Sequence, residues 1–492
     1  MLTWQTPAMA LPSMSRVAVL AIAAVALVPI LSGCGSESAA LQEVERERST
    51  DQDVPFQGCD EVDCTGEIDG AAYEIALPEK WNGTLLLYSH GYRQAQAAPP
   101  DFETPSTDPE PAPGWSGGQR EVGEALLDQG YALAGSAYAS NGWAVAEGIE
   151  AGEKLHDFFV DQVGEPDRTY VWGDSLGGLV TQVLAERNPD WVSGAAPLCG
   201  VVAGPVLNLD LALDVAYSVK TLLYPDLKLT GFASWDEAVR NWEGAYSAVL
   251  AAGSDIAVGV PKILITAALV DAPTKTKTYD GSTVESQVRA RAEALLTAVG
   301  YATFGRYDIE QRFGGNPSGN DGVDYAARVT AEERDLIETV SPGSANALLV
   351  QLADGERVTA DAAAREAFAA SGTPTGAVQD PTVLVHTASD PLVLVQNESV
   401  FAERAELNPK RTQDYLQLYT LPPASYATET GASYGAGHCN FSVDERLAVV
   451  KLLDDWVRSG AYPGPAAVAT AFEGAGGYEP NYVPGAWPAP LG

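Results

Sequence analysis

The segment TYVWGDSLGGLVTQVLAE, residues 169–186, constrains the fold more than any other part of the chain. It begins with a short apolar run typical of a buried strand and continues, after Ser175, with a pattern typical of a helix. Ser175 is the centre of a Gly-x-Ser-x-Gly pentapeptide. A tight turn between strand and helix exposes such a serine, and the two glycines allow the elements to approach each other. The segment predicts an α/β protein with Ser175 as its nucleophile.

The same pentapeptide occurs twice more, around Ser116 and Ser433. Ser116 lies within residues 93–118, which are rich in Pro, Gly and acidic residues and have no apolar period, so a surface loop is expected there. Ser433 lies in the glycine-rich stretch TGASYGAGHCNF, and no strand leads directly into it. We therefore expect neither serine to act as a nucleophile.

Strand-like and helix-like runs alternate over residues 57–203 and again over residues 376–460. This alternation predicts a mostly parallel sheet flanked by helices, built from two parts of the chain. Residues 204–375 between them are dominated by helical patterns, although the run VPKILITAALV fits either a helix or a strand. They predict a mainly helical cap, inserted after the strand that follows the nucleophile helix. Residues 461–492 are rich in Gly and Pro, and we expect an irregular tail.

A serine attacks a carbonyl carbon only when a base removes its proton, and the base needs a group that holds its tautomer. His438 lies in a glycine-rich loop after the last predicted strand, where its imidazole can reach Ser175. His386 lies within a strand run and is expected to be a hydrogen-bonded core histidine. Asp390 follows that strand, at the carboxyl edge of the sheet, whereas Asp380 precedes it. The predicted catalytic residues are Ser175, Asp390 and His438.

The oxyanion that develops during acyl transfer needs hydrogen-bond donors. The backbone N–H of Leu176, at the start of the helix after Ser175, is one predicted donor. The second is expected from the turn after the strand run GTLLLYSHGY, where Tyr92 follows Gly91. His90 in the same turn is expected to be structural.

The N-terminal region predicts a lipoprotein. After Arg16 comes an uncharged apolar run that is shorter than the ~20 residues needed to span a bilayer, and it ends in Leu-Ser-Gly-Cys at Cys34. This tetrapeptide resembles a bacterial lipobox, so we expect a signal peptide over residues 1–33, lipidation at Cys34 and a flexible tether over residues 34–56. A plain transmembrane anchor and a simple secretion signal are the alternatives, and Met14 is an alternative start. The expected location is extracytoplasmic, attached to the bacterial cell membrane.

The formal net charge of −37, from 66 acidic and 29 basic residues, argues against one class of partner. Such a surface repels phosphate backbones, so nucleic acid is not expected to bind. No metal is predicted either, because the chain has four histidines and no Cys-x-x-Cys pair. We predict no cofactor, and a small-molecule ester or peptide as the substrate.

The chain resembles members of the α/β-hydrolase superfamily over residues 71–203 and 376–458. The resemblance rests on four motifs: His90-Gly91 after the third strand, Gly173-Asp174-Ser175-Leu176-Gly177, Asp390 after the next-to-last strand, and Gly437-His438 after the last. It implies the α/β-hydrolase fold and an exported serine hydrolase that cleaves a carboxylic ester through an acyl-enzyme. It also implies that the insertion is the cap of this superfamily. A serine aminopeptidase of the same fold and a non-catalytic binding module are the alternatives.

If Cys34 carries lipid, four cysteines remain in an oxidising compartment, with three possible pairings. Cys59 and Cys64 lie close together in GCDEVDC, which suggests a local pair and leaves Cys199 with Cys439. Cys199 ends the strand after the nucleophile helix, so both cysteines of this second pair are expected at the edge of the sheet that carries the serine. Two buried free thiols are the alternative for this pair.

Cys439 directly follows His438. This placement of a cysteine resembles that in tannase and feruloyl esterase relatives. In those proteins a disulfide ties the serine loop to the histidine loop, and its first cysteine adjoins the serine. This chain has Asp174 at that position and therefore departs from the pattern.

Overall fold

The computed structural model describes residues 63–427 and 431–489 of the 492-residue chain. The predicted signal peptide and tether, with Cys34 and Cys59, lie outside the described residues.

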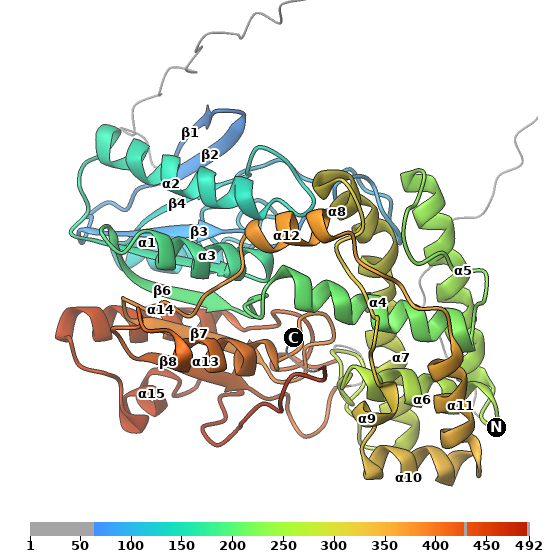
Figure 1. Cartoon of the computed structure of the whole chain (residues 1–492). Helices are drawn as coiled ribbons and strands as arrows, with labels where there is room; N and C mark the ends of the chain where they lie inside the picture. Colours follow the sequence, from blue (N-terminus) through green and yellow to red (C-terminus); the bar gives the residue numbers. More distant parts are fainter. Residues whose placement is uncertain (1–62, 428–430, 490–492) are drawn as a thin grey trace, which may run out of the picture. The chain divides into compact units, whose positions relative to one another are not determined.

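A single mixed sheet organises the core (Figure 1). Its strands are β1 (Asp63–Ile68), β2 (Ala71–Ala76), β3 (Thr84–Ser89), β4 (Ala132–Ser136), β5 (Arg168–Asp174), β6 (Val192–Leu198), β7 (Thr382–Thr387) and β8 (Tyr415–Thr420). Their order is β1-β2-β4-β3-β5-β6-β7-β8; β2 pairs antiparallel with β1 and β4, and every other pairing is parallel. The prediction of a mostly parallel α/β-hydrolase sheet is confirmed.

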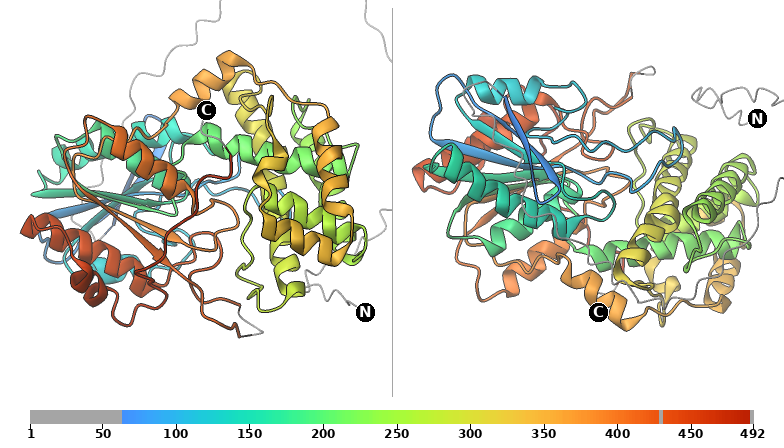
Figure 2. Two further views of the ribbon diagram at one scale, coloured as in Figure 1. Left: turned by 60° about the horizontal axis from the view of Figure 1, so that its bottom comes forward. Right: turned by 90° about the horizontal axis from the view of Figure 1, so that it is seen from above.

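Helices cover both faces of this sheet (Figure 2). They are α1 (Glu121–Asp128), α2 (Val145–Gln162), α3 (Leu176–Arg187), α13 (Asn397–Leu407) and α14 (Val443–Ser459). Leu85 and Leu87 of β3 pack in one cluster with residues of α2 and α3. Leu86 and Tyr88, which alternate with them, pack in another cluster with residues of α1 and α14. A strand buried on both faces is apolar throughout, which explains the continuous run LLLY in the sequence.

The insertion between β6 and β7 is helical, as predicted. It comprises α4 (Pro205–Leu222), α5 (Trp235–Ser254), α6 (Gly259–Leu269), α7 (Val284–Gly300), the π-helical turn η1 (Tyr301–Gly305), α8 (Arg306–Phe313), α9 (Tyr325–Arg328), α10 (Ala331–Val340), α11 (Ser344–Asp354) and α12 (Ala362–Ala370). All of them except α8 and α12 contribute to one hydrophobic cluster, which also includes Leu394 and Val400. Ile309 of α8 and Phe368 of α12 instead pack in the cluster that contains residues of α2 and α3. The ambiguous run VPKILITAALV forms α6, which is buried on nearly every side and therefore lacks an amphipathic period.

Two elements correct the sequence prediction. The strand β1 was not expected, because its interior Thr-Gly-Glu is polar and it lies at the edge of the sheet, where little apolar surface is needed. The tail is not wholly irregular, because Pro465–Ala471 forms the short helix α15. Val468 and Phe472 bury their side chains in the same cluster as residues of α14. A helix this short contributes too few turns for a period to be recognised.

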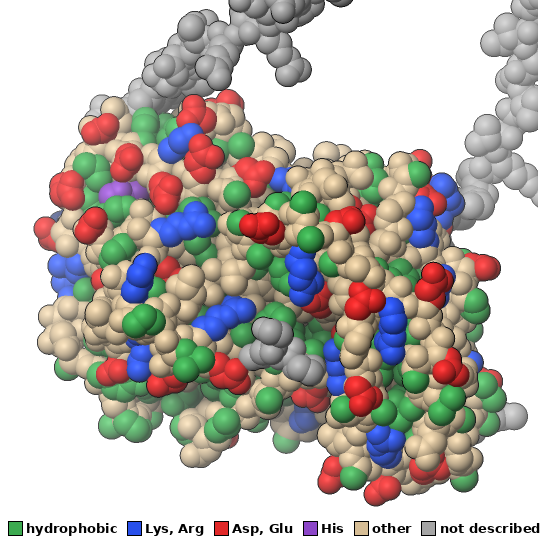
Figure 3. Space-filling view, in the orientation of Figure 1, with side chains coloured by type: hydrophobic (Ala, Val, Ile, Leu, Met, Phe, Trp, Pro, Cys, Tyr) green, Lys and Arg blue, Asp and Glu red, His purple; other side chains and the backbone are tan. Residues whose placement is uncertain are grey.

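Acidic and basic side chains are interspersed over the face shown in Figure 3, and hydrophobic side chains form small groups there. In the part of the chain that the structure describes, no single helix is long and apolar enough to cross a membrane. The pair α5 and α6 meets that criterion together by length and composition, and the two helices are bent by 118° at their junction.

Candidate active site

Ser175 occupies a strained turn between β5 and α3. Its φ of 60° and ψ of −120° lie in a region that residues other than glycine rarely adopt. The neighbouring Gly173 and Gly177 have no room for a side chain, because a Cβ atom at either would collide with the backbone oxygen of Ser89. The Ser175 N–H donates to the backbone oxygen of Leu198, 2.9 Å away, which holds the turn against β6. This geometry places the hydroxyl of Ser175, a residue that is 8 % exposed, at the carboxyl edge of the sheet.

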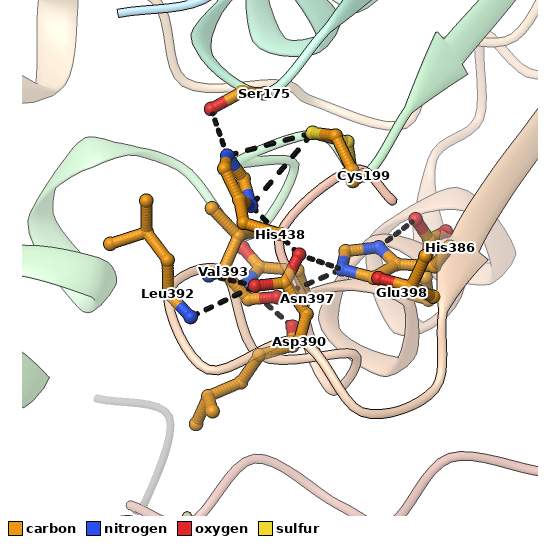
Figure 4. Close-up of polar contacts among 12 residues, drawn as sticks. Ser175, Cys199, His386, Asp390, Leu392, Val393, Asn397, Glu398 and His438 are labelled. Atoms are coloured by element: carbon orange, nitrogen blue, oxygen red, sulfur yellow. Dashed lines mark hydrogen bonds and ion pairs between the residues drawn. A yellow bond between two sulfur atoms is a disulfide. The ribbon is translucent and has the colours of Figure 1, made fainter. Parts of the chain in front are cut away.

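The structure brings Ser175, His438 and Asp390 into one hydrogen-bonded chain (Figure 4). The Nε2 atom of His438 lies 2.7 Å from Oγ of Ser175, and its Nδ1 lies 2.8 Å from Oδ2 of Asp390. The other carboxylate oxygen accepts the backbone N–H groups of Leu392 and Val393, at 2.8 and 2.9 Å. With the ring proton on Nδ1, His438 donates to the carboxylate, and its Nε2 is free to accept the serine proton.

Asp390 is only 1 % exposed, so its charge depends on its neighbours. Burial by itself would raise the pKa of this carboxyl group, but the charge and hydrogen bond of His438, the charge of His386 and a backbone N–H outweigh burial. The pKa of Asp390 is therefore lowered. The site thus holds an ionised carboxylate in a position to orient the imidazole.

His386 lies behind this carboxylate, fully buried, and contacts it at 3.8 Å. Its Nε2 lies 2.8 Å from the backbone oxygen of Val393, and its Nδ1 lies 3.1 Å from a carboxylate oxygen of Glu398. Gln417 in β8 also donates to Glu398. Burial lowers the pKa of His386, but Glu398 and Asp390 overcome this effect and the pKa is raised. His386 therefore braces the loop that carries Asp390, in keeping with the expected core histidine.

Ser116, Ser433 and His90 do not belong to the hydrogen-bonded chain from Ser175 to Asp390. Ser116 and Ser433 are both exposed in loops, one before α1 and one before α14. His90 is buried and stacks on Tyr138 with ring centres 4.0 Å apart. Its Nδ1 lies 2.6 Å from the backbone oxygen of Gly91. Burial lowers the pKa of His90 to about 4, so a neutral ring shapes the turn after β3.

The backbone after β3 passes close beside Ser175. A Cβ atom on Gly91 would lie 3.4 Å from Cβ of the serine, so Tyr92 follows at the edge of the site. Leu176 is the first residue of α3, where its N–H has no partner within the helix. The Tyr92 ring packs edge-on against Tyr301 of the cap, with ring centres 5.3 Å apart. Both predicted oxyanion donors thus border the serine, and the cap residue beside them was not identified from the sequence.

A disulfide joins the loop after β6 to the histidine loop. Cys199 and Cys439 are bonded, with Cα atoms 5.5 Å apart and 240 residues between them in sequence. This pairing is the one that the sequence favours for these two residues. Their sulfurs and a ring nitrogen of His438 lie within 4.8 Å of one another, but disulfide sulfurs are not the thiolates that bind metals. The bond holds the residue after His438 against the sheet.

An ion pair makes a second tie between the serine and histidine loops. Arg446 of α14 donates to both carboxylate oxygens of Asp174, at 2.8 and 2.7 Å, and to the backbone oxygen of Cys439 at 3.3 Å. The Tyr88 hydroxyl donates to the same carboxylate at 2.8 Å. Asp174, which directly precedes Ser175, is thus satisfied by charge and hydrogen bonds. Through Arg446, Asp174 thus ties the turn that carries Ser175 to the histidine loop.

Two hollows meet at Ser175, and both are bordered by Tyr92, Tyr301 and Leu392. The first, called the apolar cavity here, lies between the core and the cap. Its other described lining residues are Trp143, Leu176, Val201, Asn208, Leu209, Leu211, Ala212, Val215, Val270, Ala272, Ala294, Leu295, Ala298, Ile309, Pro391, Val393 and Leu394. The second, called the polar mouth, lies over the histidine loop. Its polar and charged lining residues include Glu110, Gln119, Glu121, Asp174, Lys277, His438, Asn440 and Arg446.

Comparison with known proteins gives distant similarities. No family model matches the chain. A segment of 158 residues, 32% of the chain, is 29% identical to an o-phthalyl amidase of Xanthobacter agilis and covers 30% of that protein. Several solved structures are similar in chain path, and three are described by identity, share of the two chains covered and TM-score. They are feruloyl esterase B from Aspergillus oryzae (14% identity, 82% and 80% of the two chains covered, TM-score 0.36), the rice cell wall degrading esterase LipA from Xanthomonas oryzae (13%, 73% and 82%, 0.33) and Est1E from Butyrivibrio proteoclasticus (11%, 82% and 100%, 0.33).

The class of protein follows from the fold and the geometry of the site. The strand order, with one antiparallel strand inside an otherwise parallel series, and the turn between β5 and α3 give this protein the α/β-hydrolase fold. The hydrogen-bonded chain from Ser175 through His438 to Asp390 is the arrangement typical of serine hydrolases of that superfamily.

Proposed function

We propose that this protein is a serine hydrolase that cleaves a carboxylic ester through an acyl-enzyme on Ser175. The observation that carries the proposal is the continuous chain of hydrogen bonds from Ser175 through His438 to a buried carboxylate, Asp390. In the first step, His438 Nε2 takes the serine proton while Oγ bonds to the ester carbon. The backbone N–H groups of Leu176 and Tyr92 would stabilise the oxyanion.

The second half of the reaction uses the same groups. His438 returns its proton to the departing alkoxide, which leaves as an alcohol, and the acyl group remains on Ser175. A water molecule, deprotonated by His438, then attacks the acyl carbon. The bond from this carbon to Oγ breaks, His438 returns the proton to Ser175, and the acid is released. Asp390 stays ionised throughout and stabilises the imidazolium that forms in both halves. The lowered pKa of Asp390 supports this role.

Amide hydrolysis is the second candidate, because the sequence match is to a protein named o-phthalyl amidase. The same three residues could cleave an amide by the same steps. A serine aminopeptidase is less well supported. It would need a carboxylate for the substrate's α-amino group next to the scissile carbonyl, and the described lining of the apolar cavity includes no Asp or Glu. In the polar mouth, Glu110 and Asp174 are already paired with arginines, and Glu121 stands exposed at the border. A non-catalytic binding module does not account for the alignment of the three residues.

The test of this proposal is a panel of p-nitrophenyl esters beside aminoacyl p-nitroanilides and N-acyl p-nitroanilides. We expect ester hydrolysis, and labelling of Ser175 by a fluorophosphonate, with kcat/KM for esters above that for both classes of anilide. Faster hydrolysis of an N-acyl anilide would make the protein an amidase. Faster release from aminoacyl anilides would favour the aminopeptidase. Absence of both labelling and turnover would contradict the proposed function and favour a non-catalytic binding module.

We also propose that the protein is exported and anchored by lipid at Cys34, which lies outside the described residues. The lipobox-like sequence that ends at this cysteine supports the proposal. Intact-mass analysis of the native protein should show a diacylglyceryl group on a chain that begins at Cys34, and Cys34→Ala should lack it. An unmodified mature chain that begins further along the sequence would contradict the anchor.

The disulfide supports a prediction about redox sensitivity. Mild reduction should lower esterase activity before the protein unfolds, because Cys439 adjoins His438 and the freed loop can move the imidazole away from Ser175. Since Arg446 still holds the backbone of Cys439, we expect a loss of up to about 100-fold rather than inactivation. Activity and circular dichroism are to be followed together during a dithiothreitol titration, and Cys199→Ser should show the same loss without reductant. Activity that falls only in step with unfolding would contradict this prediction.

A further inference from the structure

The two hollows at Ser175 differ in chemistry, and this difference points to a class of substrate. We propose that the enzyme selects esters of an uncharged apolar acid with a polar alcohol: the acyl chain enters the apolar cavity and the alcohol lies in the polar mouth. This inference rests on the proposed function, since it requires Ser175 to form an acyl-enzyme. It goes further because it assigns each half of the ester to one side of the serine.

The apolar cavity has few side chains that can bind a polar group. Its described lining contains no Asp, Glu, Lys or Arg. Asn208 is the one amide side chain in that lining, and it is already engaged: its Nδ2 donates to Asn397 at 2.9 Å and to the backbone oxygen of Gly204 at 2.9 Å. Asn397 in turn donates to Asn208 at 3.2 Å. The Tyr92 hydroxyl and the Trp143 indole N–H are buried and have no hydrogen-bond partner among the described residues, so they could serve single hydroxyl groups, but no side chain of this lining can pair with a charge. A charged group placed here would lose its water without gaining an ion-pair partner, whereas an alkyl chain would gain from burial.

The polar mouth, in contrast, is lined by several charged and polar side chains. Exposed Lys277 and Glu121 stand at its border, so a hydroxylated or charged group can form hydrogen bonds with them. Asn440 also lines the mouth, but its Nδ2 already donates to the backbone oxygens of Ala432 and Ala436. Glu110 also lines it and is paired with Arg93 at 3.3 Å. The mouth is therefore lined by polar and charged side chains, two of which are exposed at its border.

The position of His438 decides which half of the ester goes where. His438 borders the polar mouth and is not among the residues that line the apolar cavity in the described chain. When the C–O bond of the ester breaks, the alkoxide oxygen must receive the proton that His438 Nε2 took from Ser175. The leaving alcohol must therefore lie on the His438 side, in the polar mouth. The acyl carbon keeps its new bond to Oγ, and its chain extends away from His438, past Leu176 into the apolar cavity.

Tyr301 marks the boundary between the two hollows. It lines both of them, and it is the first residue of the π-helical turn that follows α7. Such turns are rare and occur frequently at functional sites. The Tyr301 ring rests edge-on against Tyr92, so the cap and the turn after β3 together separate the two sides.

The decisive experiment compares two ester regioisomers with the same atoms. Glycerol 1-monohexanoate joins an apolar acid to a polar alcohol, and hexyl glycerate joins a polar acid to an apolar alcohol. We expect kcat/KM to favour glycerol monohexanoate by on the order of 100-fold, because hexyl glycerate would bury two hydroxyl groups in a cavity whose lining is almost entirely apolar. Along the p-nitrophenyl acetate, butyrate and hexanoate series, kcat/KM should rise by about fourfold for each methylene that enters the cavity.

Substitutions in the cavity localise the effect. Ala212→Phe in α4 and Ala298→Phe in α7 fill it from two different helices, and each should lower the hexanoate-to-acetate ratio of kcat/KM by about tenfold or more. Ala347→Phe, on the exposed surface of α11, is the matched control and should keep the wild-type ratio. Two variants from separate helices keep the test valid if one of them fails to fold.

The outcomes separate this inference from the proposed function. Equal rates for the two regioisomers, or preference for hexyl glycerate, would overturn the assignment of the two sides. So would an unchanged hexanoate-to-acetate ratio in both folded cavity variants. In either case p-nitrophenyl acetate would still be hydrolysed and Ser175 still labelled by a fluorophosphonate. If neither hydrolysis nor labelling occurs, the proposed function itself fails, and this inference with it.

Discussion

Replacing Ser175 by alanine should abolish ester hydrolysis, with a loss of turnover on the order of 10⁶. No other group in the described site can replace its oxygen: His438 Nε2 faces this hydroxyl at 2.7 Å, and the strained turn that carries it is braced on both sides by glycines. The measurement is single-turnover and steady-state hydrolysis of a p-nitrophenyl ester. Thermal unfolding of the variant is followed in parallel. We expect the fold to be retained, because the methyl group of alanine occupies the same turn without new contacts.

The other two Gly-x-Ser-x-Gly serines provide matched controls. Ser116→Ala and Ser433→Ala make the same chemical change in the same pentapeptide, but both side chains are exposed and lie in loops. Each variant should retain wild-type turnover. An inactive but folded Ser116 or Ser433 variant, or an active Ser175 variant, would show that the wrong pentapeptide was chosen.

Much of the core could be predicted because its evidence is local. A buried parallel strand such as β3 is apolar at every position, and the nucleophile turn combines a strand, glycines and a helix within a dozen residues. The order of the chain then limits the partners of Ser175, because loops after β7 and β8 emerge at the same edge of the sheet. Asp390 and His438 were identified by that argument alone.

The parts that escaped prediction depend on contacts between distant segments. Arg446 gains its role only because α14 packs against the turn that holds Asp174, 272 residues away in sequence. Tyr301 reaches the site only because the cap folds over it, and the packing of cap helices leaves no period that reveals which residue faces inward. The strand β1 and the helix α15 were missed for a different reason: both are short and lie at the margin of the core.

Asp390→Asn is expected to reduce turnover by on the order of 10⁴ while leaving the fold intact. The carboxylate has two distinct tasks, since one oxygen accepts the N–H groups of Leu392 and Val393 and the other accepts His438 Nδ1–H. An asparagine can satisfy the two backbone donors with its carbonyl oxygen, so its NH₂ group must face His438. That group is a donor, and it forces Nδ1 to act as the acceptor. The imidazole proton then sits on Nε2, and a protonated Nε2 cannot accept the proton of Ser175.

Asp380→Asn is the control that distinguishes this mechanism from a general loss of charge near β7. Asp380 precedes that strand, at the opposite end from Asp390, and burial raises the pKa of its carboxyl group to about 6. Because it lies at the far edge of the sheet from the imidazole, its substitution should leave turnover close to that of the wild type. The comparison is made on folded protein, with kcat measured for one ester across pH 5 to 9. Near-normal activity of Asp390→Asn together with a large loss in Asp380→Asn would show that Asp380 is the catalytic acid. That result would contradict the role inferred from the hydrogen bond that joins Asp390 to His438.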